Sequence, residues 1–124
     1  MATNQSVFSD IARDPLHPAP IYRDEQVIVI RDINPKAPVH LLIVPIMPLT
    51  SLAQIGPNQE SLIGHMFVVA EEMARREGVT GTGFRLVLNQ GSDSGQEIDH
   101  MHMHLLGGKT LGTWANSAGN YRRH

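Results

Sequence analysis

The chain has 124 residues, 41% hydrophobic and 18% charged, a balance typical of one compact domain rather than a disordered chain. It contains no cysteine, which excludes disulfides and cysteine-ligated metals and is typical of a reducing cytoplasm. The formal net charge of −2 argues against a nucleic-acid polymer as partner, but a single nucleotide remains compatible. We expect neither a signal peptide nor a membrane-spanning segment, and hence a cytoplasmic protein.

The first half of the chain predicts a short helix and two strands. Residues 6–13 have apolar side chains at helical spacing, and the prolines of residues 15–20 then impose an extended segment. Val27–Arg31 and Val39–Val44 are rich in β-branched residues and predict strands. The prolines of residues 32–38 indicate a loop between them.

The second half predicts a long helix, two strands and an irregular tail. Pro57 precedes a helical pattern over residues 58–77, and Gly78 follows as a stop signal. Residues 84–89 and 98–106 predict strands, and residues 107–124 are expected to be irregular. Neighbouring strands without helical crossovers indicate a largely antiparallel sheet and an α+β fold. The apolar stripe of the helix is expected to comprise Leu62, Ile63, Met66, Phe67, Ala70, Met73 and Ala74.

Three histidines alternate strictly with apolar residues near the end of the last predicted strand. His100, His102 and His104 are therefore expected to share one face, about 6.6 Å apart at successive positions, with Met101 and Met103 on the other. A neutral imidazole offers one nitrogen as a nucleophile and the other as a donor. One ring of such a row could attack phosphorus while its neighbours orient it and stabilise charge.

Other interpretations of the histidines stay open at this point. The simplest interpretation is a solvent-exposed polar face, but three alternating histidines beside a glycine-rich segment argue against it. A His-x-His pair on a strand is also a metal-ligand pattern, with His40 as the obvious third ligand. A cupin-like metal site would need a glutamate at short range after the histidines, and none is present.

Three segments together resemble the histidine-triad (HIT) family. His100–Gly108 resembles its signature, in which three histidines alternate with apolar residues. Asp32–His40 is similar to the strand–loop–strand element of the family, and Asn89–Gln96 is similar to its phosphate loop. The resemblance covers residues 7 to 112, so residues 1–124 are expected to form one HIT domain with a core over about 7–112.

The resemblance implies a five-stranded, mainly antiparallel sheet with one long and one short helix, continued across a homodimer. It also implies hydrolysis of purine nucleoside 5′-phosphoramidates, and of aminoacyl or lysyl adenylates as further substrates, without a metal or cofactor. By position, His102 would attack phosphorus and form a nucleotidyl-histidine. His100 would orient His102, partly through its backbone carbonyl, His104 would contact phosphate oxygens, and His40 would complete the relay.

The same resemblance implies a nucleotide pocket for an AMP- or GMP-type substrate. Asp32 would bind the ribose hydroxyls, although an aspartate in that position also caps turns. Asn89 and the amides of Gly95 and Gln96 would bind phosphate oxygens. The expected apolar purine slot consists of Phe8, Ile11, Ile30, Ile33 and Leu42.

Two features leave the choice of substrate open. Glu97 stands where better-known members carry serine, and an acid there would repel an anionic leaving group or assist an amine. Trp114, in the tail, is expected either to shape the leaving-group side or to anchor the surface. The alternatives are a dinucleoside polyphosphate hydrolase or nucleotidyl transferase of the same superfamily, and a non-catalytic nucleotide sensor or scaffold.

Overall fold

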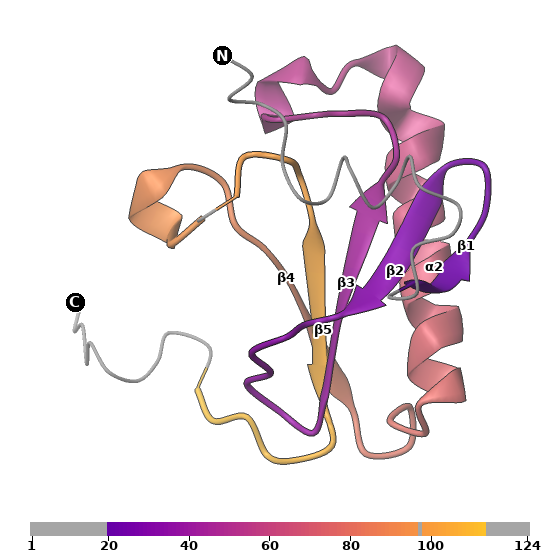
Figure 1. Ribbon diagram of the computed structural model, residues 1–124, viewed down its shortest axis with the longest axis vertical. Helices are drawn as coiled ribbons and strands as arrows, with labels where there is room; N and C mark the ends of the chain where they lie inside the picture. Colours follow the sequence, from indigo (N-terminus) through magenta and orange to yellow (C-terminus); the bar gives the residue numbers. More distant parts are fainter. Residues whose placement is uncertain (1–19, 97, 114–124) are drawn as a thin grey trace.

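A computed structural model describes residues 20–96 and 98–113, which form one antiparallel sheet covered on one face by a helix (Figure 1). The strands follow the order β1-β2-β3-β5-β4, and every neighbouring pair is antiparallel. No helix in these two ranges is long and apolar enough to cross a bilayer. The strands are β1 Pro20–Arg23, β2 Val27–Arg31, β3 Val39–Pro45, β4 Phe84–Leu88 and β5 Met103–Gly107, and the long helix is α2 Glu60–Arg76.

The predicted α+β fold is confirmed, with two differences in the strands. The segment just after the predicted proline-rich stretch pairs with β2 as an extra strand, β1. Asp24 makes this hairpin, because its carboxylate accepts the backbone N–H groups of Gln26 and Val27. The strand predicted over residues 98–106 begins only at Met103, so residues 98–102 lie outside the ladder. The short helix predicted over residues 6–13 lies outside the described residues.

The helix α2 begins and ends as its sequence predicts. The chain leaves it through Gly78, whose φ of 77° suits glycine and whose N–H donates to the Arg75 carbonyl. One residue of the predicted apolar stripe was wrong. Phe67 is 52% exposed, whereas Val69 is buried in its place, because the buried face is centred on Met66, Ala70 and Met73.

The two faces of the sheet have different surroundings. Val29, Leu41, Ile43, Met103 and Leu105 point toward α2 and form the main core with its buried side chains. The alternate residues point to the opposite face, which α2 does not cover. The strand register places two rows of cross-strand neighbours there, Leu42–His104–Val87 and His40–Leu106–Arg85. This face carries His40 and His104 of the predicted site.

Candidate active site

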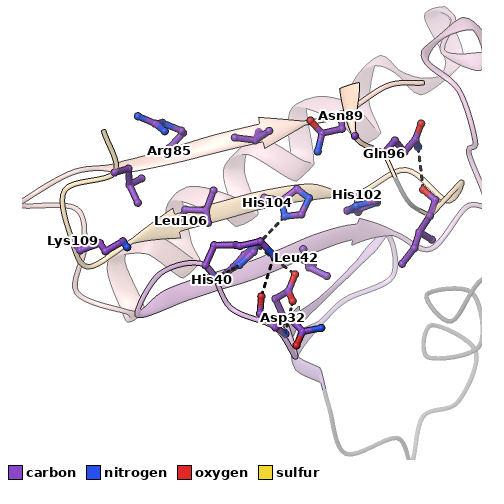
Figure 2. Close-up of a pocket in the computed structure, with 16 residues that line it drawn as sticks. Asp32, His40, Leu42, Arg85, Asn89, Gln96, His102, His104, Leu106 and Lys109 are labelled. Atoms are coloured by element: carbon purple, nitrogen blue, oxygen red, sulfur yellow. Dashed lines mark hydrogen bonds and ion pairs between the residues drawn. The ribbon is translucent and has the colours of Figure 1, made fainter. Parts of the chain in front are cut away.

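A cavity of about 490 Å³ lies on the sheet face opposite α2 (Figure 2). That volume falls in the range of small-molecule sites. Strands β3, β4 and β5 form its floor, and residues 32–36, 95, 96, 98 and 109–111 contribute its rim. The predicted site residues that line it are Asp32, His40, Leu42, Asn89, Gly95, Gln96, His102 and His104.

A backbone carbonyl sets the tautomer of His102. Its Nδ1 lies 2.8 Å from the His100 carbonyl oxygen. A carbonyl can only accept, so Nδ1 carries the hydrogen and the lone pair of the neutral ring is on Nε2. The ring is 8% exposed and lines the cavity. This is the arrangement that a nucleophilic imidazole requires.

His100 has a different environment from the other two triad histidines. It is 1% exposed, its Nε2 donates to the Pro45 carbonyl at 2.8 Å, and it does not line the cavity. The expectation that all three histidines share one face was therefore wrong. The reason lies in the backbone, since the Met101 N–H donates to the Leu49 carbonyl instead of joining the β-ladder. The contact between His100 and His102 is made by the His100 backbone carbonyl, and the orienting role implied by the resemblance stays a prediction.

A second hydrogen-bonded pair joins β3 to β5. The Lys36 backbone N–H donates to His40 Nδ1 at 3.0 Å, so in the neutral ring the proton is on Nε2. His40 Nε2 lies 2.9 Å from His104 Nδ1 and therefore donates to it. His104 then carries its own proton on Nε2, as a donor toward the cavity that it lines. The His104 and His102 ring centroids are 5.0 Å apart.

Burial keeps this pair of rings uncharged. It lowers the pKa of His104 to about 4, helped by the nearby His102 and His40 rings. It also lowers the pKa of His40, against the attraction of the Asp32 carboxylate. In His100, burial lowers the pKa although the bond to the Pro45 carbonyl opposes the shift. At neutral pH these three rings therefore act as hydrogen-bonding groups rather than as cations.

Asp32 performs the turn-capping role that its position predicted, and it also faces the cavity. One carboxylate oxygen accepts the Asn34 backbone N–H at 2.8 Å. The other lies 3.4 Å from His40 Nε2, at the edge of the cavity. Capping the turn does not use all the lone pairs of the carboxylate, so its cavity-facing edge keeps acceptor capacity.

The predicted phosphate loop reaches the cavity, but one of its amides is already used. The Gly95 N–H donates to the Ser92 carbonyl, which closes a short 3-10 turn over Ser92–Ser94. This amide therefore has a partner within the loop, and its binding to phosphate stays a prediction. The Gln96 side chain holds the loop, because it accepts from the Gly91 N–H and donates to the Ile98 carbonyl. Asn89 remains a cavity-lining amide.

The predicted purine slot is only partly within the described residues. Leu42 lines the cavity, and Ile30 is buried beside it on the neighbouring strand β2. Ile33 projects from the loop and is 91% exposed. Phe8, Ile11, Glu97 and Trp114 lie outside the described residues.

The HIT domain family matches this chain over residues 17–111, which include the cavity and all four site histidines. The chain belongs to the HIT family. It is 39% identical over 108 residues to the purine nucleoside phosphoramidase of Escherichia coli K12, covering 87% of this chain and 91% of that protein. It is also 40% identical over 104 residues to an uncharacterised HIT-like protein of Synechocystis, covering 84% and 90%.

Solved structures agree with this assignment. A HIT family hydrolase from Legionella pneumophila superposes with a TM-score of 0.83 at 34% identity, covering 90% of this chain and 98% of that one. A histidine triad protein from Clostridium difficile gives 0.81 at 38% identity, covering 87% and 94%. The five-stranded antiparallel sheet with one main helix is therefore that of the HIT fold.

One cluster in this HIT domain has the spacing of a metal site. The ligand atoms of Asp32, His40 and His104 all lie within 4.8 Å of one another. A metal on His40 Nε2 would have to displace the proton that the Lys36 N–H confines to that nitrogen. The hydrogen bond from His40 to His104 accounts for the cluster without an ion.

The predicted site did not include the cations of the cavity. Lys36, Arg85 and Lys109 line it together with the apolar Leu106 and Leu111. The signal for Arg85 was present in the sequence, because alternation along the predicted strand places Arg85 on the same face as Asn89. The two lysines lie in loops, where no periodicity indicates a direction.

Proposed function

We propose that the protein hydrolyses the P–N bond of purine nucleoside 5′-phosphoramidates through a nucleotidyl-His102 intermediate. The observation that carries this proposal is the hydrogen bond from His102 Nδ1 to the His100 carbonyl, which puts the lone pair of a cavity-lining ring on Nε2. The 39% identity to a purine nucleoside phosphoramidase supports the same substrate class. Aminoacyl and lysyl adenylates, which also place a leaving group on the α-phosphorus, are the second class.

In the first step, His102 Nε2 forms a bond to phosphorus while the P–N bond breaks. The electron pair of that bond stays on nitrogen, which takes up a proton from solvent and departs as an amine. The attacking ring becomes positively charged but keeps its Nδ1–H, and the His100 carbonyl stabilises that charge. His104 donates its Nε2–H to a phosphate oxygen, in a tautomer held by His40.

In the second step, water attacks phosphorus and the P–Nε2 bond breaks, with its electron pair returning to His102. The products are a nucleoside 5′-monophosphate and a proton. Splitting one displacement into two lets the same histidine face a different partner in each step. None of these steps calls on a metal ion or an organic cofactor.

For the nucleotide, we assign the ribose to Asp32 and the phosphate to Asn89 and the Gln96 backbone. The carboxylate edge of Asp32 at the cavity can accept the two hydroxyl donors of a ribose. Leu42 and the neighbouring Ile30 offer an apolar surface for the purine, to which Phe8, Ile11 and Ile33 would add. Glu97 would lie on the leaving-group side.

We further propose that the protein is a homodimer in the cytoplasm, in which two β4 strands pair. Among the described residues β4 hydrogen-bonds only to β5, so its outer edge can accept another strand. On α2, Phe67 and Val68 are 52% and 65% exposed and suit a dimer contact. Phe67→Glu should convert the dimer to monomers in light scattering, whereas the exposed control Thr80→Glu should not. A monomeric wild-type protein would contradict the proposal.

Steady-state kinetics on adenosine 5′-phosphoramidate test the proposed activity. Wild-type protein should release ammonia and AMP, and His102→Asn should lose at least about a thousandfold in kcat/KM because the nucleophile is absent. His65→Asn is the matched control, since His65 bonds Asp24 outside the cavity. Equal turnover by wild type and His102→Asn would contradict the assignment. Faster hydrolysis of diadenosine tetraphosphate would favour the dinucleoside polyphosphate alternative.

A further inference from the structure

The cavity extends well beyond the atoms that a nucleoside phosphate needs. His102, Asn89 and Gln96 lie at one end of it, while Arg85 and Lys109 lie at the other, with His104 and Leu106 between them (Figure 2). Leu106 follows His104 by two residues on β5, so the far end lies about 6.6 Å beyond the His104 row. A substrate that filled only the histidine end would leave this part of the cavity to water.

Three cations from separate segments line the cavity. Arg85 is directly opposite Leu106 in the β4–β5 register, Lys109 follows β5, and Lys36 precedes β3. Asp32 is the one acidic residue among the described residues that line the cavity. Both lysines of the whole chain are in this group. Such a concentration of positive charge favours an anionic ligand.

The described part of the fold does not use these three cations for ion pairs. Arg31, Arg75 and Arg76 all pair with glutamates of α2 or of its C-terminal cap. By contrast, the bonds of Arg85 and Lys36 within residues 20–96 and 98–113 are to backbone carbonyls, at 2.7 Å from Arg85 to Gly112 and at 3.4 Å from Lys36 to Asn34. Their charge, like that of Lys109, is therefore available to a ligand.

The direction of attack tells which part of the substrate reaches the cations. An in-line displacement places the leaving nitrogen on the side of phosphorus opposite His102 Nε2. From His102, the cavity runs past His104 toward Leu106, Arg85 and Lys109 (Figure 2). The nucleoside is assigned to a different part of the cavity, at Asp32. The leaving amine is thus the part of the substrate that projects into the cationic end.

We propose that the cationic end, formed by Arg85 and Lys109, selects leaving amines that carry a negative charge, such as the carboxylate of an α-amino acid. This inference rests on the proposed phosphoramidase function and adds the substrate class. Leu106 and Leu111 line the same end, so the methylene groups of such an amine meet an apolar surface while its anion meets the cations. A carboxylate and a phosphate ester on the amine share the chemistry that these cations recognise.

The test compares amines of different charge on one nucleotide. The adenosine 5′-phosphoramidate of glycine carries a carboxylate on its amine, and that of glycinamide carries a neutral amide in the same place. The aminoethyl phosphate derivative carries a phosphate instead, and the ethylenediamine derivative carries a cation. The ratio of kcat/KM for glycine over glycinamide should be about three to five for each cation that contacts the carboxylate. The ethylenediamine derivative should be the poorest of the four substrates. Comparing kcat/KM for the glycine and the aminoethyl phosphate derivatives tells whether the site prefers a carboxylate or a phosphate.

Variants then connect the preference to the cations. In Lys109→Gln and in Arg85→Gln/Lys109→Gln the glycine-to-glycinamide ratio should fall toward one. Arg75→Gln removes an exposed arginine on the far side of the sheet and should keep the wild-type ratio. The single variant keeps the test usable if the double variant fails to fold.

Two results would overturn the inference, and they are distinguishable. A wild-type ratio of one or below, or a ratio unchanged in Lys109→Gln, would refute the selectivity while leaving the phosphoramidase function intact. Failure to cleave any of these compounds, including unsubstituted adenosine 5′-phosphoramidate, would refute the proposed function and the inference with it.

Discussion

Replacing His104 by asparagine should make the free energy of unfolding depend less on pH. Burial lowers the pKa of this ring from 6.5 to about 4 in the folded protein. The unfolded chain therefore binds a proton at higher pH than the folded one does, so the free energy of unfolding rises with pH. The stabilising contribution of the neutral ring is complete above about pH 6.5 and is lost as the pH falls toward about 4.

The size of the effect follows from that shift. At pH 5 the unfolded ring is almost fully protonated, whereas the folded ring is still mostly neutral. Linkage then lowers the free energy of unfolding by about 2 kcal/mol between pH 7.5 and pH 5 on account of His104 alone. His40 and His100 shift in the same direction and add to the wild-type slope, and both remain in the variant.

Urea unfolding at fixed protein concentration measures the effect. Wild type should lose about 2 kcal/mol more than His104→Asn when the pH is lowered from 7.5 to 5. Between pH 7.5 and 8.5 the difference between the two proteins should stay constant, because the ring is neutral in both states. If the free energies of unfolding of the two proteins fell in parallel down to pH 5, the ring would be solvated. That result would refute the buried His40–His104 pair.

The remaining predictions concern the core, the hairpin and the ribose. Met66 is 0% exposed beneath the sheet, so Met66→Ala should cost about 2–5 kcal/mol in urea unfolding, and a cost below 1 kcal/mol would contradict that packing. Asp24→Asn weakens bonds to His65 at 2.6 Å and Tyr22 at 2.7 Å and should cost about 1–3 kcal/mol with kcat/KM unchanged. Asp32→Asn should raise KM about tenfold for a ribonucleotide and much less for its 2′,3′-dideoxy analogue. Equal effects on both sugars would remove Asp32 from ribose binding.

Local patterns in the sequence predicted most of the fold and singled out the histidines of the candidate site. β-branched runs located β2 and β3, and the proline before the helix and Gly78 after it located both ends of α2. Alternation correctly placed Met103 and Leu105 in the core and His104 on the opposite face. These features depend on near neighbours in the chain, so the sequence carries them directly.

What the sequence could not predict depends on contacts between distant segments. His100 leaves the cavity face because Pro45 and Leu49, some fifty residues earlier, supply carbonyls to its ring and to the Met101 N–H. The tautomer of His40 depends on a backbone N–H at Lys36, and no property of the side chains indicates it. The cationic end likewise exists only because β4 pairs with β5 and brings Arg85 beside Leu106.

The nucleotidyl-histidine intermediate is the central claim, and intact-mass spectrometry after rapid acid-free quenching tests it most directly. Mixing wild-type protein with adenosine 5′-phosphoramidate should add the mass of one adenylyl group per chain, and peptide mapping should locate it on His102. His102→Asn should gain nothing, while the control His65→Asn should be labelled like wild type. Substrate turnover without any such adduct, or an adduct on another residue, would contradict the account.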